Sequence, residues 1–513
     1  MATPKETEIK LELPRSAIGQ LERLQLLRNC KEPKRHQTYV SVYFDTDKLA
    51  LKKNGFTFRV RRAGRQYLQT VKAERPGLDR DEWETEISDK KPDLRAARET
   101  GLKALLSKKI EAKLRPIFET RVRRTTYPLA DGKIELTLDV GKIDTGAETA
   151  PLCELEVEAK GGSKAELFKV AGEVARATGA ELALASKAQR GYELLTKRRD
   201  APVKADPVTL PAGIATREAF RAIAFACLKQ VTGNKHALLK GDPEGVHQMR
   251  VGLRRLRSAI SLFGDILDDP QTEAVKRDLK WLTDELGPAR ELEVFVTNVV
   301  EPAQQHPRRW RDLPSIAHDL ADRREAAVDQ ARAAVQSERF RRLLLDVAAW
   351  LDTGNWTRPH DDLVRERGDV PIETSAAGEL TRRWKKIRKK GRTLTQLDPV
   401  SRHKLRIQAK KMRYAIDFFE SIFGKSPKRR EAFRSGLKAM QDCLGELNDI
   451  AVHRDLAAEV AGQPAPRKRG RGNSQRPFQV GLLTGQEFGR LDAVLARSED
   501  AFDALAKCKP FWT

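Results

Sequence analysis

Strict alternation of polar and apolar residues in eight short stretches of the first 200 residues constrains the fold more than any other feature of the sequence. Alternation with a period of two is typical of a β-strand, because successive side chains point to opposite faces. The first stretch, Glu6–Leu13, places Glu6, Glu8, Lys10 and Glu12 on one face. Seven more follow within residues 38–46, 55–61, 67–72, 80–88, 118–123, 134–140 and 154–158. Joined mostly by short turns, they predict an eight-stranded antiparallel sheet that closes into a β-barrel.

The polar face of this predicted sheet is almost wholly ionisable, and its charges are sorted by strand. One strand offers only acids, Glu154, Glu156 and Glu158, whereas two others offer mainly bases, Arg59 with Arg61 and Arg121 with Arg123. An outer face in water normally mixes polar residues along each strand. We therefore favour a charged barrel interior that holds metal ions at one end and phosphates along the rest. The alternative is a plain two-layer sheet with a solvated face.

The carboxylates of the first stretch have a spacing that suits a cation. Glu6 and Glu8 lie about 7 Å apart on a strand, so both can converge on one hard cation or bridge a pair of them. Lys10 lies one step further along, where it can meet an anion held by that metal. Ligands that are all oxygen favour Mg²⁺ or Mn²⁺ over zinc. For this stretch alone, the alternative is the ordinary solvated face of an edge strand.

Composition limits the classes of binding partner and the cellular compartment to be considered. With 97 basic and 73 acidic residues, the net charge of +24 points to an anionic partner such as nucleic acid, a membrane surface or a phosphate polymer. The five cysteines are scattered, which favours a reducing compartment over a disulfide framework or a zinc site. Since no apolar run approaches the roughly 20 residues of a membrane span, we expect a cytoplasmic protein without a membrane partner.

The character of the chain changes after residue 200. Residues 201–212 are rich in proline and predict a semi-rigid linker. From residue 213 to 510 the pattern becomes helical and repeats, because His247–Arg257 matches His403–Arg413, 156 residues later. The duplication predicts an all-α domain of two pseudo-symmetric helical bundles, about 213–370 and 371–510, in an α+β multidomain protein. Residues 462–476 are low in complexity and basic, and predict a flexible insertion between helices.

Each copy of the repeat carries a stripe of basic residues beside its apolar seam. The stripe is His247, Arg250, Arg254 and Arg257 in the first copy, and His403, Arg406, Lys410 and Arg413 in the second. Like charges at helical spacing repel one another, so the stripes need an anion or acidic neighbours. Because a nearby phosphate favours the charged form of histidine, we expect His247 and His403 to contact phosphate rather than metal. The alternative is a solvated basic face.

The first 200 residues resemble the CYTH, or triphosphate tunnel metalloenzyme, family. The resemblance rests on Glu6-x-Glu8-x-Lys10, followed in order by segments 55–61, 70–72, 80–84, 121–123, 153–158 and 186–187. It implies an eight-stranded antiparallel tunnel that binds triphosphate and two divalent cations. By position it implies metal ligands at Glu6, Glu8, Glu154, Glu156 and Glu158, without deciding which of the last three bind metal. Phosphate ligands are implied at Lys10, Arg59, Arg61, Lys72, Arg121, Arg123 and Lys187, with Glu6, Glu8 and Lys10 at the catalytic centre.

Residues 213–510 resemble the CHAD domain, a helical module rich in histidine and basic residues. The paired motifs at 247–257 and 403–413 carry this resemblance, although Glu291 stands where the family more often has Asp. It implies that a basic groove between the two bundles binds inorganic polyphosphate through the eight stripe residues. Association with polyphosphate granules is a further expectation.

Together these features predict metal-dependent hydrolysis of inorganic triphosphate or short polyphosphate in the tunnel, with polyphosphate binding by the helical domain. Positive charge around the phosphate oxygens and a metal that activates water are what phosphoryl transfer requires. The alternatives are a CYTH adenylate cyclase or thiamine triphosphatase, and a non-catalytic polyphosphate-binding scaffold. We do not expect nucleic acid as the partner, because the stripes contain no aromatic residue to stack bases, although Tyr414 follows directly.

Overall fold

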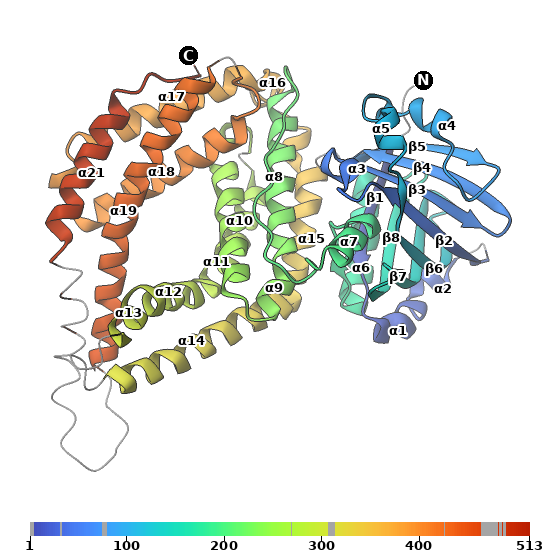
Figure 1. Cartoon of the computed structure of the whole chain (residues 1–513), viewed down its shortest axis with the longest axis horizontal. Coiled ribbons are helices and arrows are strands. Elements are labelled where there is room, and N and C mark those ends of the chain that lie inside the picture. The colour runs from blue at the N-terminus through green and yellow to red at the C-terminus, as the bar shows by residue number, and fades with distance from the viewer. Residues whose placement is uncertain are drawn as a thin grey trace, which may run out of the picture.

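A computed structural model describes residues 5–30, 33–73, 79–267, 269–305, 313–424, 426–462, 481, 485 and 489–512. It has two parts that lie side by side, a β-sheet domain and a larger helical domain (Figure 1). All eight stretches predicted from alternation are strands. The strands are β1 (Lys5–Glu12), β2 (Arg35–Asp45), β3 (Phe56–Ala63), β4 (Gln66–Ala73), β5 (Asp79–Ile87), β6 (Arg115–Leu129), β7 (Ile134–Asp144) and β8 (Thr149–Ala159). A short ninth strand, β9 (Glu181–Leu182), was not predicted.

The strands form one antiparallel sheet in the order β5-β4-β3-β2-β6-β7-β8-β1-β9. Strand β1 pairs with three other strands of the described chain, β8, β9 and β5. It pairs with β8 through five opposed residues, from Glu8 with Glu158 to Glu12 with Glu154, and also with β9. Three further residue pairs join β1, the next-to-last strand of this order, to β5, the first. In the described part of the chain the sheet therefore has nine strands, and the eight-stranded barrel predicted from the sequence is not confirmed in that detail.

Short helices flank the sheet and have recognisable start signals. The longest, α6, begins with a capping box in which Ser163 and Glu166 satisfy each other's backbone N–H groups. Helix α7 follows the N-cap Ser186 and packs against β6, with Gly191 facing Phe118. The helices are α1 (Ile18–Glu22), α2 (Gln25–Arg28), α3 (Ala50–Lys53), α4 (Leu94–Arg98), α5 (Lys108–Glu111), α6 (Lys164–Thr178) and α7 (Lys187–Leu195). Helix α7 spans nine residues, which is too short for a clear helical period in the sequence.

The helical domain begins after the linker. Its helices are α8 (Thr216–Gly233), α9 (Lys235–Leu239), α10 (Pro243–Leu262), α11 (Pro270–Glu285), α12 (Gly287–Phe295), α13 (Glu301–Gln304), α14 (Leu313–Gln336), α15 (Glu338–Thr353), α16 (Asp362–Asp369), α17 (Ile372–Gly391), α18 (Pro399–Phe419), α19 (Pro427–Gly462) and α21 (Leu491–Ala506). Apart from Gly462, the predicted insertion at 462–476 lies outside the described residues. No helix in the described ranges is both long and apolar enough to cross a lipid bilayer.

The internal repeat is visible in how the first helices of the two copies, α8 and α17, begin. Ala215 and Pro371 form an isolated antiparallel bridge. Around it, Thr216 N donates to Val370 O and Ile372 N donates to Ile214 O, both at 2.9 Å. These positions differ by 156 residues, the spacing of the sequence repeat. The two copies are therefore joined where their first helices start, and α10 packs against its counterpart α18.

The two domains share one apolar core. Helix α6 of the sheet domain packs against α15 of the helical domain (Figure 1), and buried residues from both parts belong to the same cluster. At this interface, the buried Asp352 pairs with Arg221 at 2.8 Å and with Lys164 of α6 at 3.6 Å. The linker also contributes to this core, since Val208 and Leu210 are buried in it. The domains thus pack through a continuous apolar contact.

Candidate functional site

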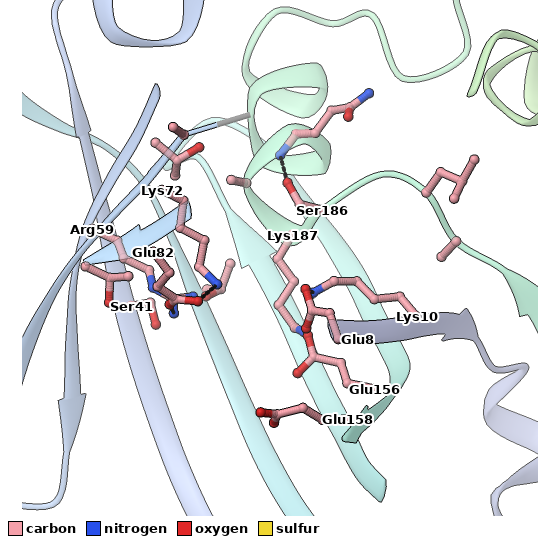
Figure 2. Close-up of a pocket in the computed structure, with 18 of the residues that line it drawn as sticks. Glu8, Lys10, Ser41, Arg59, Lys72, Glu82, Glu156, Glu158, Ser186 and Lys187 are labelled. Carbon is pink, nitrogen blue, oxygen red and sulfur yellow. Dashed lines mark hydrogen bonds and ion pairs between the residues drawn. The ribbon is translucent and has the colours of Figure 1, made fainter. Parts of the chain in front are cut away.

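A cavity of about 940 Å³ lies against the inner face of the sheet and is lined mainly by charged and hydroxyl side chains. Its charges are separated in space. Figure 2 shows Glu8, Lys10, Glu156, Glu158 and Lys187 gathered on one side, and Arg59, Lys72 and Glu82 on the other. The first group comes from β1, β8 and the start of α7, and the second from β3, β4 and β5. The alternation of each strand turns these side chains inward and its apolar residues outward.

Two lysines neutralise the acidic side of the cavity. Lys10 Nζ lies 3.0 Å from Glu8 Oε1 and 2.7 Å from Glu156 Oε1. Lys187 Nζ lies 2.6 Å from Glu154, 2.7 Å from Glu156 and 2.9 Å from Asp139. Burial alone would raise the pKa of Glu156, yet Lys10, Lys187 and Arg124 hold it well below its ordinary value. Glu156 is therefore a fixed negative charge at the centre of this group.

The basic side of the cavity has an excess of positive charge. Lys72 donates to Glu82 at 2.6 Å, and Arg59 lies 3.7 Å from the same carboxylate. Burial, together with the neighbouring Arg59 and Arg124, lowers the pKa of Arg61 to about 10. The Nε atoms of Arg59 and Arg61 are buried and have no hydrogen-bond acceptor among the described residues. Because a buried donor without an acceptor is costly, this side is suited to an anion.

A second cavity, of about 880 Å³, lies between the two copies of the helical repeat. Helix α10 contributes His247, Arg250 and Arg254, and α18 contributes Arg406, Lys410 and Arg413. We call this cavity the basic groove. Further basic residues, which the sequence did not single out, come from other helices: Arg290, His453 and Arg490. Six of the eight stripe residues therefore line one groove.

Charges in the basic groove are only partly neutralised by the protein, in which Glu291 lies 4.0 Å from Arg250 and Asp449 lies 3.7 Å from Arg406. Burial, with Arg406 and Arg254 nearby, lowers the pKa of Lys410 to about 7. Burial and Arg290 lower the pKa of His247 to about 4, so this histidine is uncharged at neutral pH without a ligand. His247 Nδ1 and the Nε atoms of Arg254, Arg406 and Arg413 are buried without an acceptor among the described residues. A polyanion would supply the missing negative charge and acceptors.

Comparison with known protein families also divides the chain into a sheet domain and a helical domain. Residues 4–192 match the CYTH domain family, and residues 222–458 match the CHAD domain family. The chain is a CYTH–CHAD protein. The CYTH domain contains the charged sheet cavity, and the CHAD domain contains the basic groove.

Individual relatives are more distant. A stretch of 87 residues, 17% of this chain and 25% of the relative, is 37% identical to an inorganic triphosphatase of Haemophilus influenzae. An uncharacterized protein of Mycobacterium tuberculosis is 27% identical over 292 residues, which are 52% of this chain and 48% of that protein. The chain thus spans between a quarter and about half of the length of these relatives. A CHAD domain structure from the plant Ricinus communis, 30% identical, covers 58% of this chain and 96% of that domain, with a TM-score of 0.49.

Strand β6 of the CYTH domain turns a different arginine inward from those expected. Arg121 and Arg123 are exposed and do not line the cavity, whereas Arg124 does. Arg124 makes a bidentate pair with Asp139, at 2.7 Å through each nitrogen, and a 2.6 Å contact with Glu156. The prediction that Arg121 and Arg123 face the interior is therefore wrong for this structure. Its cause is that both faces of β6 carry arginine, so alternation separates the faces without deciding which one is inside.

The five acidic residues predicted as metal ligands in the CYTH domain differ in their position relative to the cavity. Glu8, Glu156 and Glu158 line the cavity, whereas Glu154 is fully buried behind Lys187 and outside the lining. Burial, partly offset by Lys187, raises the pKa of Glu154. The side chain of Glu6 lies outside the described residues. Among the described residues, no three acidic, histidine or cysteine side chains are grouped closely enough to hold a metal ion. The acids are instead paired with lysines.

Two predicted stripe residues of the CHAD domain do not line the basic groove. Arg257 is exposed, and His403 reaches the groove only indirectly, through its ring Nδ1 contact with Asn448. The reason is axial distance, since residues ten apart on a helix lie about 15 Å apart. The groove therefore takes the beginning of the stripe on α10 and the end of the stripe on α18.

Proposed function

We propose that this protein is a metal-dependent hydrolase of inorganic triphosphate and short polyphosphate, and that the cavity of its CYTH domain is the catalytic site. The observation that carries the proposal is the arrangement of charge in that cavity. A cluster of carboxylates faces a cluster of buried cations, and two guanidinium Nε atoms have no acceptor within the described part of the chain. The 37% identity of a short stretch to an inorganic triphosphatase supports the same reading.

The residues of the basic side would bind and orient the substrate. Arg59 and Arg61 are positioned to donate planar pairs of N–H groups to phosphate oxygens. Lys72 would add a third positive charge, since its amine already lies beside Arg59 and Glu82. Burial makes these charges effective, because water screens them less there than at the surface. Holding the phosphates in this way stabilises the charge that spreads over their oxygens during transfer.

Residues of the acidic side fit a hard divalent cation, Mg²⁺ or Mn²⁺, because they offer only oxygen. Glu8, Glu156 and Glu158, together with Glu6, would hold it after their side chains move closer, because the described carboxylates are not grouped closely enough as they stand. Bound there, the ion would neutralise phosphate charge and lower the pKa of water. The buried Glu154 is better suited to anchoring Lys187. Lys10 lies between Glu8 and Glu156, and Lys10 and Lys187 hold the pKa of the buried Glu156 well below its ordinary value. The two ammonium groups are also within one cavity with the phosphates, so each can exchange a carboxylate partner for a phosphate oxygen.

For the CHAD domain we propose polyphosphate binding in the basic groove. His247, Arg250 and Arg254 from one copy and Arg406, Lys410 and Arg413 from the other would contact the chain of phosphates. The depressed pKa of Lys410 supports this, because buried lysines near several arginines gain most from an added anion. Tyr414 of the groove is almost fully buried, which does not favour nucleic acid, since base stacking needs accessible aromatic rings.

The experiment that tests the catalytic proposal compares kcat/KM for tripolyphosphate, ATP and thiamine triphosphate with Mg²⁺ or Mn²⁺ present. Tripolyphosphate should be the best substrate. Arg61→Ala should lower its kcat/KM by about 10²-fold, as loss of a preorganised donor does. Arg62→Ala is the matched control, since Arg62 is exposed on the same strand and does not line the cavity. A clear preference for ATP or thiamine triphosphate would contradict the proposed substrate class.

A separate measurement distinguishes the possible partners of the basic groove. Short polyphosphate and single-stranded RNA are titrated against each other at several salt concentrations, with wild type and Arg254→Ala/Arg406→Ala. The proposal predicts that polyphosphate displaces RNA and that the double substitution weakens its binding. Preferential binding of RNA would contradict it. Polyphosphate binding by a folded protein that hydrolyses none of the three substrates would identify a non-catalytic scaffold instead.

A further inference from the structure

The wall of the CYTH cavity is not made by the sheet domain alone. The same cavity that contains Glu8, Lys10 and Arg59 is also lined by Asp206–Thr209 of the linker and by Phe225, Ala226 and Lys229 of α8. These residues belong to the part of the chain that follows the CYTH domain. The helical domain therefore forms part of the rim of the proposed catalytic cavity.

This part of the rim is fixed by packing. Val208 and Leu210 are buried in the apolar core common to both domains. Val203 exchanges two hydrogen bonds with the side chain of Asn234, both at 2.8 Å, and Leu210 N donates to Ser421 Oγ at 2.9 Å. Across the domain boundary, Lys235 forms an ion pair with Glu181 of β9. The linker segment thus has a defined position beside the cavity.

Lys229 is the one basic residue that this segment and α8 add to the described lining of the cavity. Its side chain is 38% exposed, and its Nζ lies 3.8 Å from Asp206 Oδ2, which is itself 72% exposed. An ion pair of this length between exposed groups contributes little free energy. The ammonium group can therefore leave Asp206 for a stronger anion at small cost. Lys229 lines the cavity from the helical domain, whereas Arg59, Arg61 and Lys72 line it from the sheet.

We propose that Lys229 of the helical domain is a specificity-determining residue of the CYTH cavity, which binds the phosphates of chains longer than triphosphate where they leave the cavity. This inference rests on the proposed function, because it assumes that inorganic phosphate chains occupy the cavity. On this proposal the sheet cations Arg59, Arg61 and Lys72 hold the phosphates of a triphosphate, and each additional phosphate of a longer chain brings negative charge toward Lys229. The helical domain thereby influences which chain lengths the CYTH domain uses.

The test measures kcat and KM separately for tripolyphosphate and for a longer linear polyphosphate. It uses the full-length protein carrying Arg254→Ala/Arg406→Ala, so that capture in the basic groove does not contribute. Lys229→Ala should raise KM for the longer chain about threefold to tenfold, as loss of one charge-assisted contact does, and leave both constants for tripolyphosphate within about twofold. Asp206→Asn should lower KM for the longer chain, because it removes the competing carboxylate. Lys204→Ala is the control, since Lys204 is exposed in the same linker and does not line the cavity.

Equal effects of Lys229→Ala on both substrates, or no effect on either, would overturn the inference while leaving the hydrolase intact. Calorimetric binding of both phosphates in the absence of divalent metal makes the two proposals separable. If no variant hydrolyses phosphate, but Lys229→Ala still weakens binding of the longer chain only, the catalytic proposal fails and the role of Lys229 stands. If binding of the longer chain is also unchanged, the inference fails with it.

Discussion

Lys10 of β1 donates a hydrogen bond from Nζ to Oε1 of Glu156 at 2.7 Å, and the two residues lie directly opposite each other on β1 and β8. The same carboxylate oxygen accepts a hydrogen bond from Lys187, also at 2.7 Å. Two ammonium groups thus share one carboxylate in the cavity of the CYTH domain. This arrangement keeps acidic and basic groups charged and adjacent, which a site that exchanges partners with a cation and a phosphate chain requires.

Removing Lys187 should destabilise the CYTH domain strongly. Lys187→Ala leaves Asp139, Glu154 and Glu156 buried without their common counterion. Loss of one partner of a buried pair costs roughly 3–5 kcal/mol, and urea denaturation followed by circular dichroism measures it. Lys160→Ala is the control, because Lys160 pairs with Glu158 of the same strand but is 45% exposed. Its cost should stay below about 1 kcal/mol. Similar costs for both variants would contradict the importance of the buried cluster.

Helix α7 packs closely against the sheet because Gly191 has no side chain. A Cβ at this position would lie 2.2 Å from the ring of Phe118, and Phe118 is itself stacked on Tyr43 with centroids 4.5 Å apart. Gly191→Ala should therefore shift α7, cost roughly 1–3 kcal/mol as overpacking does, and reduce phosphate hydrolysis because Lys187 begins this helix.

The matched control is Gly172→Ala in α6, where a Cβ would meet only Leu345, at 3.9 Å. Replacing a helical glycine by alanine without a clash stabilises a protein by about 0.5–1 kcal/mol. Relative to wild type, the Tm of the Gly191→Ala variant should therefore fall and the Tm of the Gly172→Ala variant should rise. A Gly191→Ala protein with unchanged stability and activity would show that α7 has more freedom than its packing indicates.

Polyphosphate binding by the CHAD domain should weaken as pH rises above 7. The pKa of Lys410 is about 7 in the free protein, because of burial beside Arg406 and Arg254. A bound polyanion favours the charged form and raises this pKa, so binding takes up a proton wherever the free lysine is neutral. The contribution of Lys410 to the affinity is then full below pH 7 and falls by up to about tenfold per pH unit above it. Calorimetry in buffers of different ionisation enthalpy measures the proton uptake.

Two variants of α18 check that assignment. Lys410→Arg should flatten the pH dependence, because arginine stays charged. Lys404→Ala should retain it, since Lys404 is exposed on the same helix and does not line the basic groove. Proton uptake that persists unchanged in Lys410→Arg would place the titrating group elsewhere.

Alternation predicted the strands of the CYTH domain and the inward faces of β1 and β8. On these strands one face is apolar and packed against helices, so only the charged face can line a cavity. Strand β6 is different, because Thr120, Val122 and Arg124 line the cavity while Arg121 and Arg123 lie in solvent. A strand that is polar on both sides does not specify its inner face. Tertiary contacts, here of Arg124 with Asp139 and Glu156, decide it.

In the helical half, the repeat predicted the basic stripes on α10 and α18, and the resemblance to the CHAD domain implied a groove between them, but neither identified the other residues that line the groove. Arg290, His453 and Arg490 belong to segments without a stripe, and only the packing of α12, α19 and α21 brings them to α10 and α18. Lys229 was equally hidden from the sequence, because its role depends on how the linker and α8 lie beside the CYTH cavity. Sequence periodicity describes a single element, whereas these residues depend on how elements meet.

The most direct test of the central claim is phosphate release from tripolyphosphate by wild type, Glu8→Gln and Glu12→Gln, titrated with Mg²⁺ and Mn²⁺. Glu8 and Glu12 lie on the same strand, but Glu8 lines the cavity and Glu12 does not. We expect metal-dependent turnover, which Glu8→Gln lowers by at least about 10²-fold and Glu12→Gln leaves nearly unchanged. Turnover that needs no metal, or that both variants retain, would contradict the assignment of this cavity as the catalytic site.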